Sequence, residues 1–326
     1  MTKITDVAKK AGVAKSTVSN VLTGKKYVSE ELRVKVLEAC REMDFQPNFY
    51  ASRLSKRKTN IIALLLESTQ ELSVYQQELI CACIVEASKR RYSLLVYYES
   101  DREKLMLTLK QGMAPVDGAI IMAPVINDER LSSLENNRIS CKVIGRPGVP
   151  DIGYVDVDNR QLVKDVVDKM TEIYGKDIYL VNSTSDMTIS LDRKQGFTEK
   201  CVEKGINPEN RITESRLRSS VESYEFAKLH MKKYSAFVTA DEIMAKGVYA
   251  AIEERGLKVG KDVGVFALGR DTKHGSFEPK LSHAVQDYKE LGRLAVDILL
   301  DDINGKEAKN ILIGSKLVLT ESTQKA

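Results

Sequence analysis

The chain of 326 residues is too long for one small domain and suits two or three packed units. With 43% hydrophobic and 29% charged residues, 7 Pro and 19 Gly, its composition excludes collagen-like, disordered and low-complexity proteins. It has no apolar run long enough to span a membrane and no signal-peptide core, so we expect a cytosolic protein. The five cysteines, an odd number without C-x-x-C spacing, predict neither a disulfide framework nor a metal site.

Positive charge is concentrated at the N-terminus. Residues 1–58 contain 13 Lys or Arg and 6 Asp or Glu, a net charge of +7, whereas the remaining 268 residues have a net charge of −3. A basic head on a near-neutral body predicts that the head binds a polyanion. A solvated lysine-rich surface would produce the same imbalance, so charge alone leaves both interpretations open.

Apolar spacing predicts three short helices in this head. The first covers residues 4–11 and stops at Gly12, and the second ends at Gly24. Ser29 is expected to cap the third, whose predicted apolar face is Leu32, Val36, Leu37, Cys40 and Met43. Two short helices joined by a glycine-containing turn and braced by a third predict a helix-turn-helix. An ordinary three-helix core would show the same periodicity, but it would not explain the concentrated charge.

The chain after the third helix reads as a linker. Pro47 interrupts it, and Asn48 can cap a short helix that runs to Leu54. Because so short a helix is unstable alone, it needs a partner to order it.

Four stretches of the head carry a recognisable set of motifs: Ile4–Val13, Ser16–Leu22, Tyr27–Ser29, and Pro47-Asn48 with Ala51 and Leu54. In these motifs and their spacing the head resembles the lactose-repressor (LacI/GalR) family over about 60 residues. The resemblance implies a DNA-binding headpiece, a hinge helix and an effector-binding core that acts as a homodimer on a pseudo-palindromic operator, without a cofactor.

The resemblance also assigns roles to single residues. Base-reading positions on the second helix are occupied by Lys15, Ser16 and Asn20. Phosphate contacts are expected from Thr5, Thr17, Ser19, Lys25, Lys26 and Ser29. The hinge contributes Asn48, Ala51 and Leu54, the leucine being a wedge for the minor groove. Asn20 replaces a common arginine and the hinge reads Ala-Ser-Arg-Leu, departures that bear on the operator sequence rather than on DNA binding.

From residue 61 the pattern becomes buried strands alternating with helices. Strands are predicted at 61–66, 93–97, 118–122, 142–144, 178–182, 236–239 and 263–267. This order predicts an α/β fold of two doubly wound parallel-sheet lobes, similar to periplasmic sugar-binding proteins. We therefore expect a helix-turn-helix domain at 1–46, a hinge at 47–60 and a core at 61–326. Its N-lobe covers about 61–158 and 286–310, and its C-lobe about 159–285 and 311–326.

Candidate effector residues follow the predicted strands, where such folds bind ligands. Arg193 begins an Arg-x-x-Gly-Phe motif that resembles the family's ligand-gripping segment, and Asp241 or Glu242 matches its polar-Asp segment. The further candidates are Ser73, Tyr75, Arg146 and Arg270. Asp158 and Asn159 lie near the crossover between the lobes. If Arg270, Arg193 and Arg146 all face the cleft, the ligand carries phosphate or carboxylate.

Together these patterns predict a ligand-responsive transcription regulator, most simply a repressor of carbohydrate-use genes controlled by a sugar or sugar phosphate. A corepressor-dependent regulator, one that needs a phosphorylated partner protein, and a non-DNA-binding sugar sensor are the alternatives. An enzyme is not expected, since common catalytic and nucleotide-binding motifs are missing and the three histidines are widely spaced.

Overall fold

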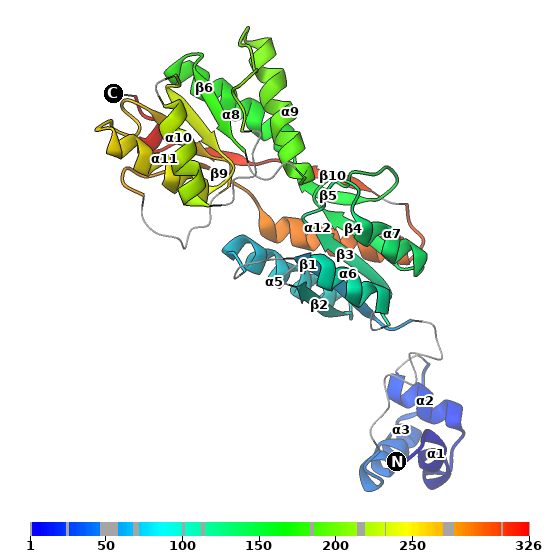
Figure 1. Ribbon diagram of the computed structural model, residues 1–326. Helices are drawn as coiled ribbons and strands as arrows, with labels where there is room; N and C mark the ends of the chain where they lie inside the picture. Colours follow the sequence, from blue (N-terminus) through cyan, green and yellow to red (C-terminus); the bar gives the residue numbers. More distant parts are fainter. Residues whose placement is uncertain are drawn as a thin grey trace. The chain divides into compact units, whose positions relative to one another are not determined.

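The computed structural model describes residues 2–23, 26–45, 58–67, 72–99, 102–111, 115–182, 186–213, 219–231, 233–269, 277–307 and 309–325. The chain divides into two compact units, a head of residues 1–59 and a core of residues 60–326 (Figure 1).

The head contains the three predicted helices: α1 (Ile4–Ala11), α2 (Lys15–Thr23) and α3 (Glu30–Glu42). Gly12 ends α1 in the left-handed conformation (φ 65°), which glycine adopts without a steric penalty. Ser29 occupies the residue before α3, but its side chain makes no capping hydrogen bond. The predicted position of the cap is therefore right and its predicted chemistry is wrong.

A small apolar cluster holds the head together. Its buried members are Val7, Ala8, Val18, Val36 and Ala39. The predicted face of α3 is wrong at one position, because Leu37 is 36% exposed whereas Ala39 is buried. Residues three and four apart share a helix face, so Val36 brings Ala39 inward and turns Leu37 toward solvent.

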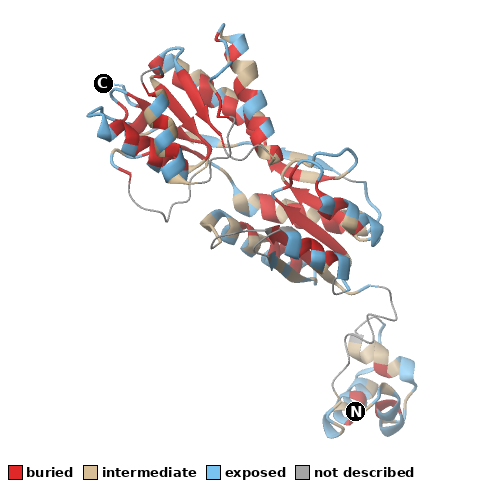
Figure 2. Cartoon of the chain, viewed as in Figure 1, coloured by how far each residue is buried: buried red, intermediate tan, exposed pale blue. Residues whose placement is uncertain are grey.

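The first lobe of the core is a parallel sheet of six strands, in the order β10-β5-β4-β3-β1-β2. Its strands are β1 (Ile61–Glu67), β2 (Ser93–Glu99), β3 (Gly118–Met122), β4 (Ser140–Ile144), β5 (Tyr154–Val157) and β10 (Asn310–Ile313). Its helices are α5 (Val74–Lys89), α6 (Arg102–Gln111), α7 (Glu129–Asn136) and α12 (Tyr288–Ile303). All five residues of β3 are buried, as a parallel strand covered on both faces requires (Figure 2).

The second lobe is a five-stranded sheet in the order β11-β9-β8-β7-β6, in which only β11 is antiparallel to its neighbour. Its strands are β6 (Ile178–Val181), β7 (Ala236–Thr239), β8 (Gly264–Ala267), β9 (Ser282–Val285) and β11 (Lys316–Val318). Its helices are α8 (Asn159–Tyr174), α9 (Thr188–Glu203), α10 (Ser220–His230), α11 (Glu242–Glu254) and a 3-10 turn at Glu321–Thr323.

The last change of lobe comes later than predicted. Strand β10 pairs with β5 in the first sheet, so the chain enters the second lobe after Ile313 rather than at residue 311. An Ile-Leu-Ile segment fits either sheet, and only its pairing partner decides which one it joins. The sequence patterns also missed α7, β5, β9, β10 and β11.

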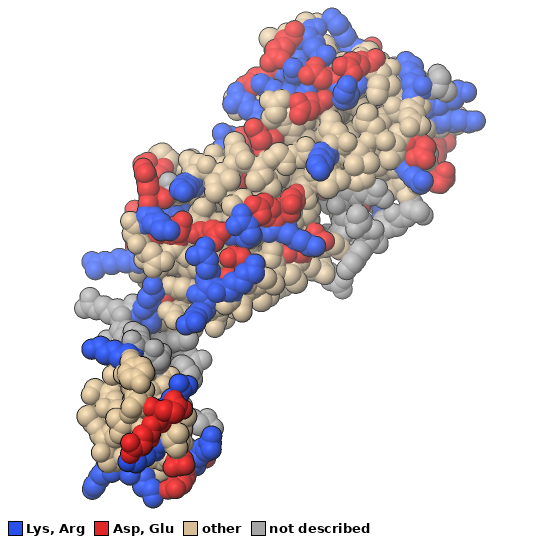
Figure 3. All heavy atoms as spheres, turned by 180° about the vertical axis from the view of Figure 1, so that it is seen from behind, with Lys and Arg blue, Asp and Glu red and all other residues tan. Residues whose placement is uncertain are grey.

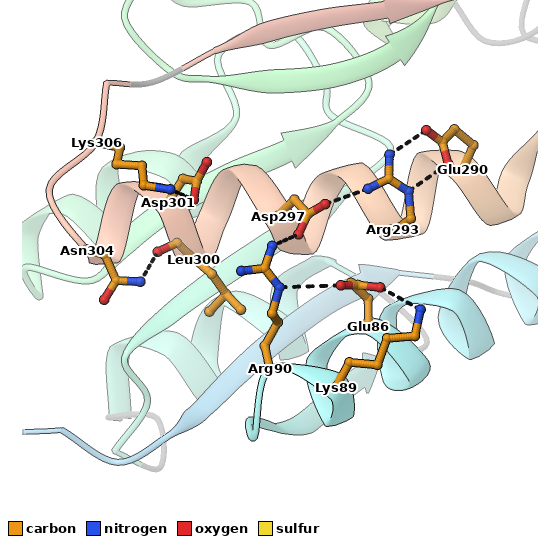
Figure 4. A network of polar contacts seen from close by, with 10 residues as sticks. All are labelled: Glu86, Lys89, Arg90, Glu290, Arg293, Asp297, Leu300, Asp301, Asn304 and Lys306. Atoms are coloured by element: carbon orange, nitrogen blue, oxygen red, sulfur yellow. Dashed lines mark hydrogen bonds and ion pairs between the residues drawn. The ribbon is translucent and has the colours of Figure 1, made fainter.

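Helices α5 and α12 pack closely on one face of the first sheet. A Cβ on Gly292 would lie 2.7 Å from the carbonyl oxygen of Leu79, so glycine permits this approach. A chain of ion pairs runs along the outside of the contact (Figure 4), with Arg293 bonded to both Glu290 and Asp297 at 2.6 Å. Exposed ion pairs stabilise little, so the apolar packing beneath them holds the two helices together.

Candidate DNA-binding head and interlobe site

The second helix and its flanks form a basic, acid-free part of the head. Residues 7–29 contain five lysines and no Asp or Glu. Two of the acidic groups of α3 have partners of their own: Glu42 pairs with Lys10 and Glu31 with Lys35, both at 2.9 Å. On the face of the core drawn in Figure 3, by contrast, acidic and basic side chains are mixed.

Most of the predicted DNA-contacting residues are accessible. Thr5, Lys15, Ser16, Lys26 and Ser29 are exposed, whereas Thr17, Ser19 and Asn20 are half-buried. Lys25, Asn48, Ala51 and Leu54 lie outside the described residues, as does the predicted hinge helix.

The base-reading candidates share one side of α2. Lys15, Ser16 and Asn20 are spaced as neighbours on a helix surface, next to the phosphate-contact candidate Ser19, and Val18 points into the core of the head. Ammonium, hydroxyl and amide groups together supply the donors and acceptors that major-groove base edges and phosphates bind.

Arg193 is the central residue of the candidate effector site. It lies on α9 and is only 6% exposed. Its Nε donates to Asn159 Oδ1 at 3.3 Å and its Nη1 to the carbonyl oxygen of Ala240 at 3.2 Å. Burial lowers the pKa of its guanidinium, while Tyr288 and Asp241 act in the opposite direction. Both of these acceptors are neutral, so neither of them forms an ion pair with the guanidinium.

One acidic residue of the second lobe acts on Arg193. Asp241 caps α11, its Oδ1 accepting from the backbone nitrogen of Met244 at 2.9 Å, and it interacts electrostatically with Arg193. Burial raises the pKa of Asp241. Its neighbour Glu242 is buried as well, at 2% exposed.

Two of the first-lobe candidates differ in role. Tyr75 is 39% exposed, lies 5.3 Å from Tyr288 between ring centroids, and acts electrostatically on Arg193. These aromatic rings suit the apolar face of a ligand. Ser73 instead caps α5, since its Oγ accepts from the backbone nitrogen of Gln76 at 3.4 Å. Its hydroxyl is already used by the helix.

Arg146 forms an ion pair with Asp192 of α9, and its backbone nitrogen donates to Asp156 Oδ2 at 3.1 Å. Burial raises the pKa of Asp156 to about 6. Because Asp192 neutralises Arg146, and Arg270 lies outside the described residues, the cluster of three arginines proposed for an anionic ligand is not supported. Two arginines and three aspartates gather here instead.

The sequence patterns missed four members of this cluster, or named them only by position: Asp156, Asn159, Asp192 and Tyr288. Asp156 belongs to β5, which was not predicted, and Asn159 follows directly where the chain crosses between lobes. Tyr288 begins α12 after the second crossing. Polar residues at chain crossings were the signal that could have found Asp156, Asn159 and Tyr288.

Two open hollows lie elsewhere on the core. A groove of about 640 Å³ runs beside α5 and α12, and another hollow of about 620 Å³ lies on the second lobe beside Tyr179 and His230. No predicted effector residue lines either of them. Within the described ranges, no group of three or more His, Cys, Asp or Glu is placed to hold a metal ion.

The comparisons with known proteins agree with this arrangement. Residues 3–48 match the family described as bacterial regulatory proteins, lacI family, and residues 175–323 match a periplasmic binding protein-like domain. The head is a lacI-family domain. Together with the periplasmic binding protein-like domain, it gives the chain the domain organisation of a transcriptional regulator of that family.

Relatives named as transcriptional regulators match this chain over nearly its whole length. The HTH-type transcriptional regulator RegA of Clostridium saccharobutylicum is 28% identical over 336 residues, which cover 99% of each chain. The HTH-type transcriptional repressor PurR of Edwardsiella ictaluri is 27% identical over 329 residues, covering 98% of this chain and 96% of the relative.

Solved structures share the fold of this chain. A lac repressor dimer bound to operator and the anti-inducer ONPF superposes with a TM-score of 0.84 at 24% identity, covering 99% of both chains. A complex of the regulator CelR with cellobiose has a TM-score of 0.73 at 23% identity, covering 99% of this chain and 100% of that one. In the part of the chain that the structure describes, no helix is both long and apolar enough to cross a membrane.

Proposed function

We propose that this regulator is a homodimeric repressor that binds a pseudo-palindromic operator and is controlled by a neutral, polyhydroxylated ligand held between the lobes of its core. The proposal is carried by two features of one chain. The first is the exposed, acid-free face of α2, and the second is the group of charged residues around the buried Arg193 (Arg146, Asp156, Asp192 and Asp241), here called the Arg193 cluster. The face of α2 supplies contacts to a polyanion, and the Arg193 cluster supplies ligand contacts on both lobes.

The charges around Arg193 favour a neutral ligand. Asp192 compensates Arg146, and Asp156 and Asp241 act on Arg193. A phosphate would therefore meet carboxylates as well as the guanidinium, whereas sugar hydroxyls can donate to the former and accept from the latter. The Tyr75 and Tyr288 rings suit the apolar face of a sugar ring. The cellobiose bound by CelR is a ligand of this kind.

Exposed apolar residues support a dimer through the first lobe. Ile84 and Val85 on α5 are 48% and 54% exposed, and Val96 and Tyr98 on β2 are 37% and 43% exposed. Strand β2 is the edge of its sheet, and Val96 and Tyr98 point to the same face as Leu94, which packs against the core beside α5. Clustered apolar side chains at a sheet edge are typical of a protein interface.

The proposal is tested with the full-length protein. DNA sequences that it binds are selected from a random duplex library, and fluorescence anisotropy then measures its affinity for the enriched sequences. We expect an inverted repeat with half-sites about one helical turn apart. Thermal-shift screening with neutral sugars, sugar phosphates and nucleobases then identifies the effector, which should change operator affinity. Enrichment of no inverted repeat over random duplex would overturn DNA-binding control, and stabilisation by sugar phosphates alone would overturn the neutral-ligand assignment.

A further inference from the structure

The two lobes touch at a place separate from the chain crossings. The loop after β3 lies against the segment that leads into α9. The backbone nitrogen of Thr188 donates to the carbonyl oxygen of Pro124 at 3.3 Å, and that of Ile126 donates to the carbonyl oxygen of Asp186 at 3.0 Å. Val125 and Met187 form an isolated antiparallel bridge between these bonds. This contact is a short piece of sheet that joins the lobes.

An ion pair crosses between the lobes beside this bridge. Arg146 follows β4 of the first lobe, and its guanidinium pairs with Asp192 of α9 in the second. The arginine side chain is 41% exposed, whereas that of the aspartate is only 8% exposed. The charge contributed by the second lobe is therefore buried and depends on a cation from the first.

The backbone around Arg146 is held in place by the same loop. Gly145 has φ 109°, and a Cβ there would lie 2.6 Å from Cδ of Pro124, so glycine allows the strand end and the loop to pack together. Asp156 fixes the next residue by accepting from the backbone nitrogen of Arg146 at 3.1 Å. Only the side chain of Arg146 is left to adjust to the other lobe.

We infer that Arg146 and Asp192 form an interlobe latch, which stabilises the contact between the loop at Pro124 and the start of α9 in the absence of any ligand. Separating the lobes breaks the pair and leaves a buried carboxylate without its cation, and this penalty opposes separation. If the proposed function holds, the latch also biases the effector response, because Asp192 precedes Arg193 on α9 and a ligand acts on the same turn.

Hydrogen exchange of the full-length protein, without DNA or ligand, tests the latch directly. The amides of Ile126 and Thr188 report the lobe contact, and the amide of Leu268, which bonds Thr239 within the second lobe, reports global stability. In Asp192→Asn we expect peptides covering 124–128 and 186–190 to exchange about tenfold faster, the equivalent of one charged hydrogen bond. The peptide covering Leu268 should be unchanged.

A matched control removes an ion pair inside one lobe. Lys164 on α8 pairs with Glu199 on α9 at 2.7 Å, so Lys164→Gln should leave exchange at Ile126 and Thr188 as slow as in the wild type. Arg146→Gln should accelerate those amides more than Asp192→Asn does, since it leaves the buried carboxylate charged, and the double variant should return to the rate of Asp192→Asn.

Unchanged exchange at Ile126 and Thr188 in Asp192→Asn would overturn the latch. Equal acceleration at Leu268 would also overturn it, because the pair would then contribute to general stability. Neither result depends on operator or effector, so the latch and the proposed function can fail separately.

Discussion

Gly196 lies directly against the backbone of Arg160: a Cβ at position 196 would come within 2.4 Å of the Arg160 carbonyl oxygen. This glycine follows Arg193 by three residues in the Arg-x-x-Gly-Phe motif, and its missing side chain lets α9 approach α8. Gly196→Ala should therefore separate the two helices and lower the free energy of unfolding by about 1–3 kcal/mol. Urea unfolding measures this, with Gly314→Ala as the control, since no heavy atom lies within 4 Å of a Cβ placed there. Equal stability of both variants would contradict the packing role.

Arg193→Gln should abolish the thermal stabilisation produced by whichever screened sugar stabilises the wild type. Glutamine can still donate one hydrogen bond toward Asn159 or Ala240, but it carries neither the charge nor the fork of donors that a ligand would use. Operator binding without ligand should persist. Lys194→Gln, a change at the exposed neighbouring position, serves as the control. A full ligand response in Arg193→Gln would remove this residue from the site.

The Arg193 cluster shows where sequence patterns succeed and where they stop. The strands β1, β3 and β7 were predicted because long buried apolar runs leave few other structures. Arg193 was found because it begins a motif. Asp192, next to it, was missed because its importance lies in a partner 46 residues away, and no local pattern reports an ion pair between lobes. Ser73 illustrates a different limit, since a ligand-facing serine and a helix cap look alike in sequence.

The stability of the core should depend on the ionisation of Asp156. Burial raises its pKa from the ordinary value of 3.8 to about 6 in the folded protein. Between pH 4 and 6 the folded state therefore holds more protons than the unfolded state, and stability falls as pH rises. This decrease in the free energy of unfolding is complete above about pH 6 and amounts to at most about 3 kcal/mol. Asp156→Asn lacks this titration, so its stability relative to the wild type should rise from pH 4 to pH 7 in urea unfolding. A pH-independent difference would contradict the raised pKa.

Charge placed on the exposed apolar surface of the first lobe should weaken the proposed dimer. Tyr98→Asp on the edge strand buries a carboxylate against the partner if β2 forms the interface, and about a tenfold rise in the dimer dissociation constant is expected. Sedimentation equilibrium gives that constant. The matched control is Leu229→Asp on α10, where the side chain is 79% exposed on the other lobe. A larger effect of Leu229→Asp would indicate that the interface lies on the second lobe.

Removing each of three lysines of the head should affect DNA binding in a different way. Lys26→Ala deletes an expected phosphate contact, so it should weaken binding to all duplexes alike and reduce the salt dependence of log K by about one for each subunit. Lys15→Ala, on the base-reading face of α2, should change which operator is preferred. Lys35 of α3 pairs with Glu31 at 2.9 Å, and its removal should leave affinity and salt dependence nearly unchanged. Anisotropy titrations between 50 and about 200 mM KCl on selected and scrambled duplexes measure all three. If Lys35→Ala matches Lys26→Ala, the head binds DNA through diffuse charge rather than through α2 and its flanks.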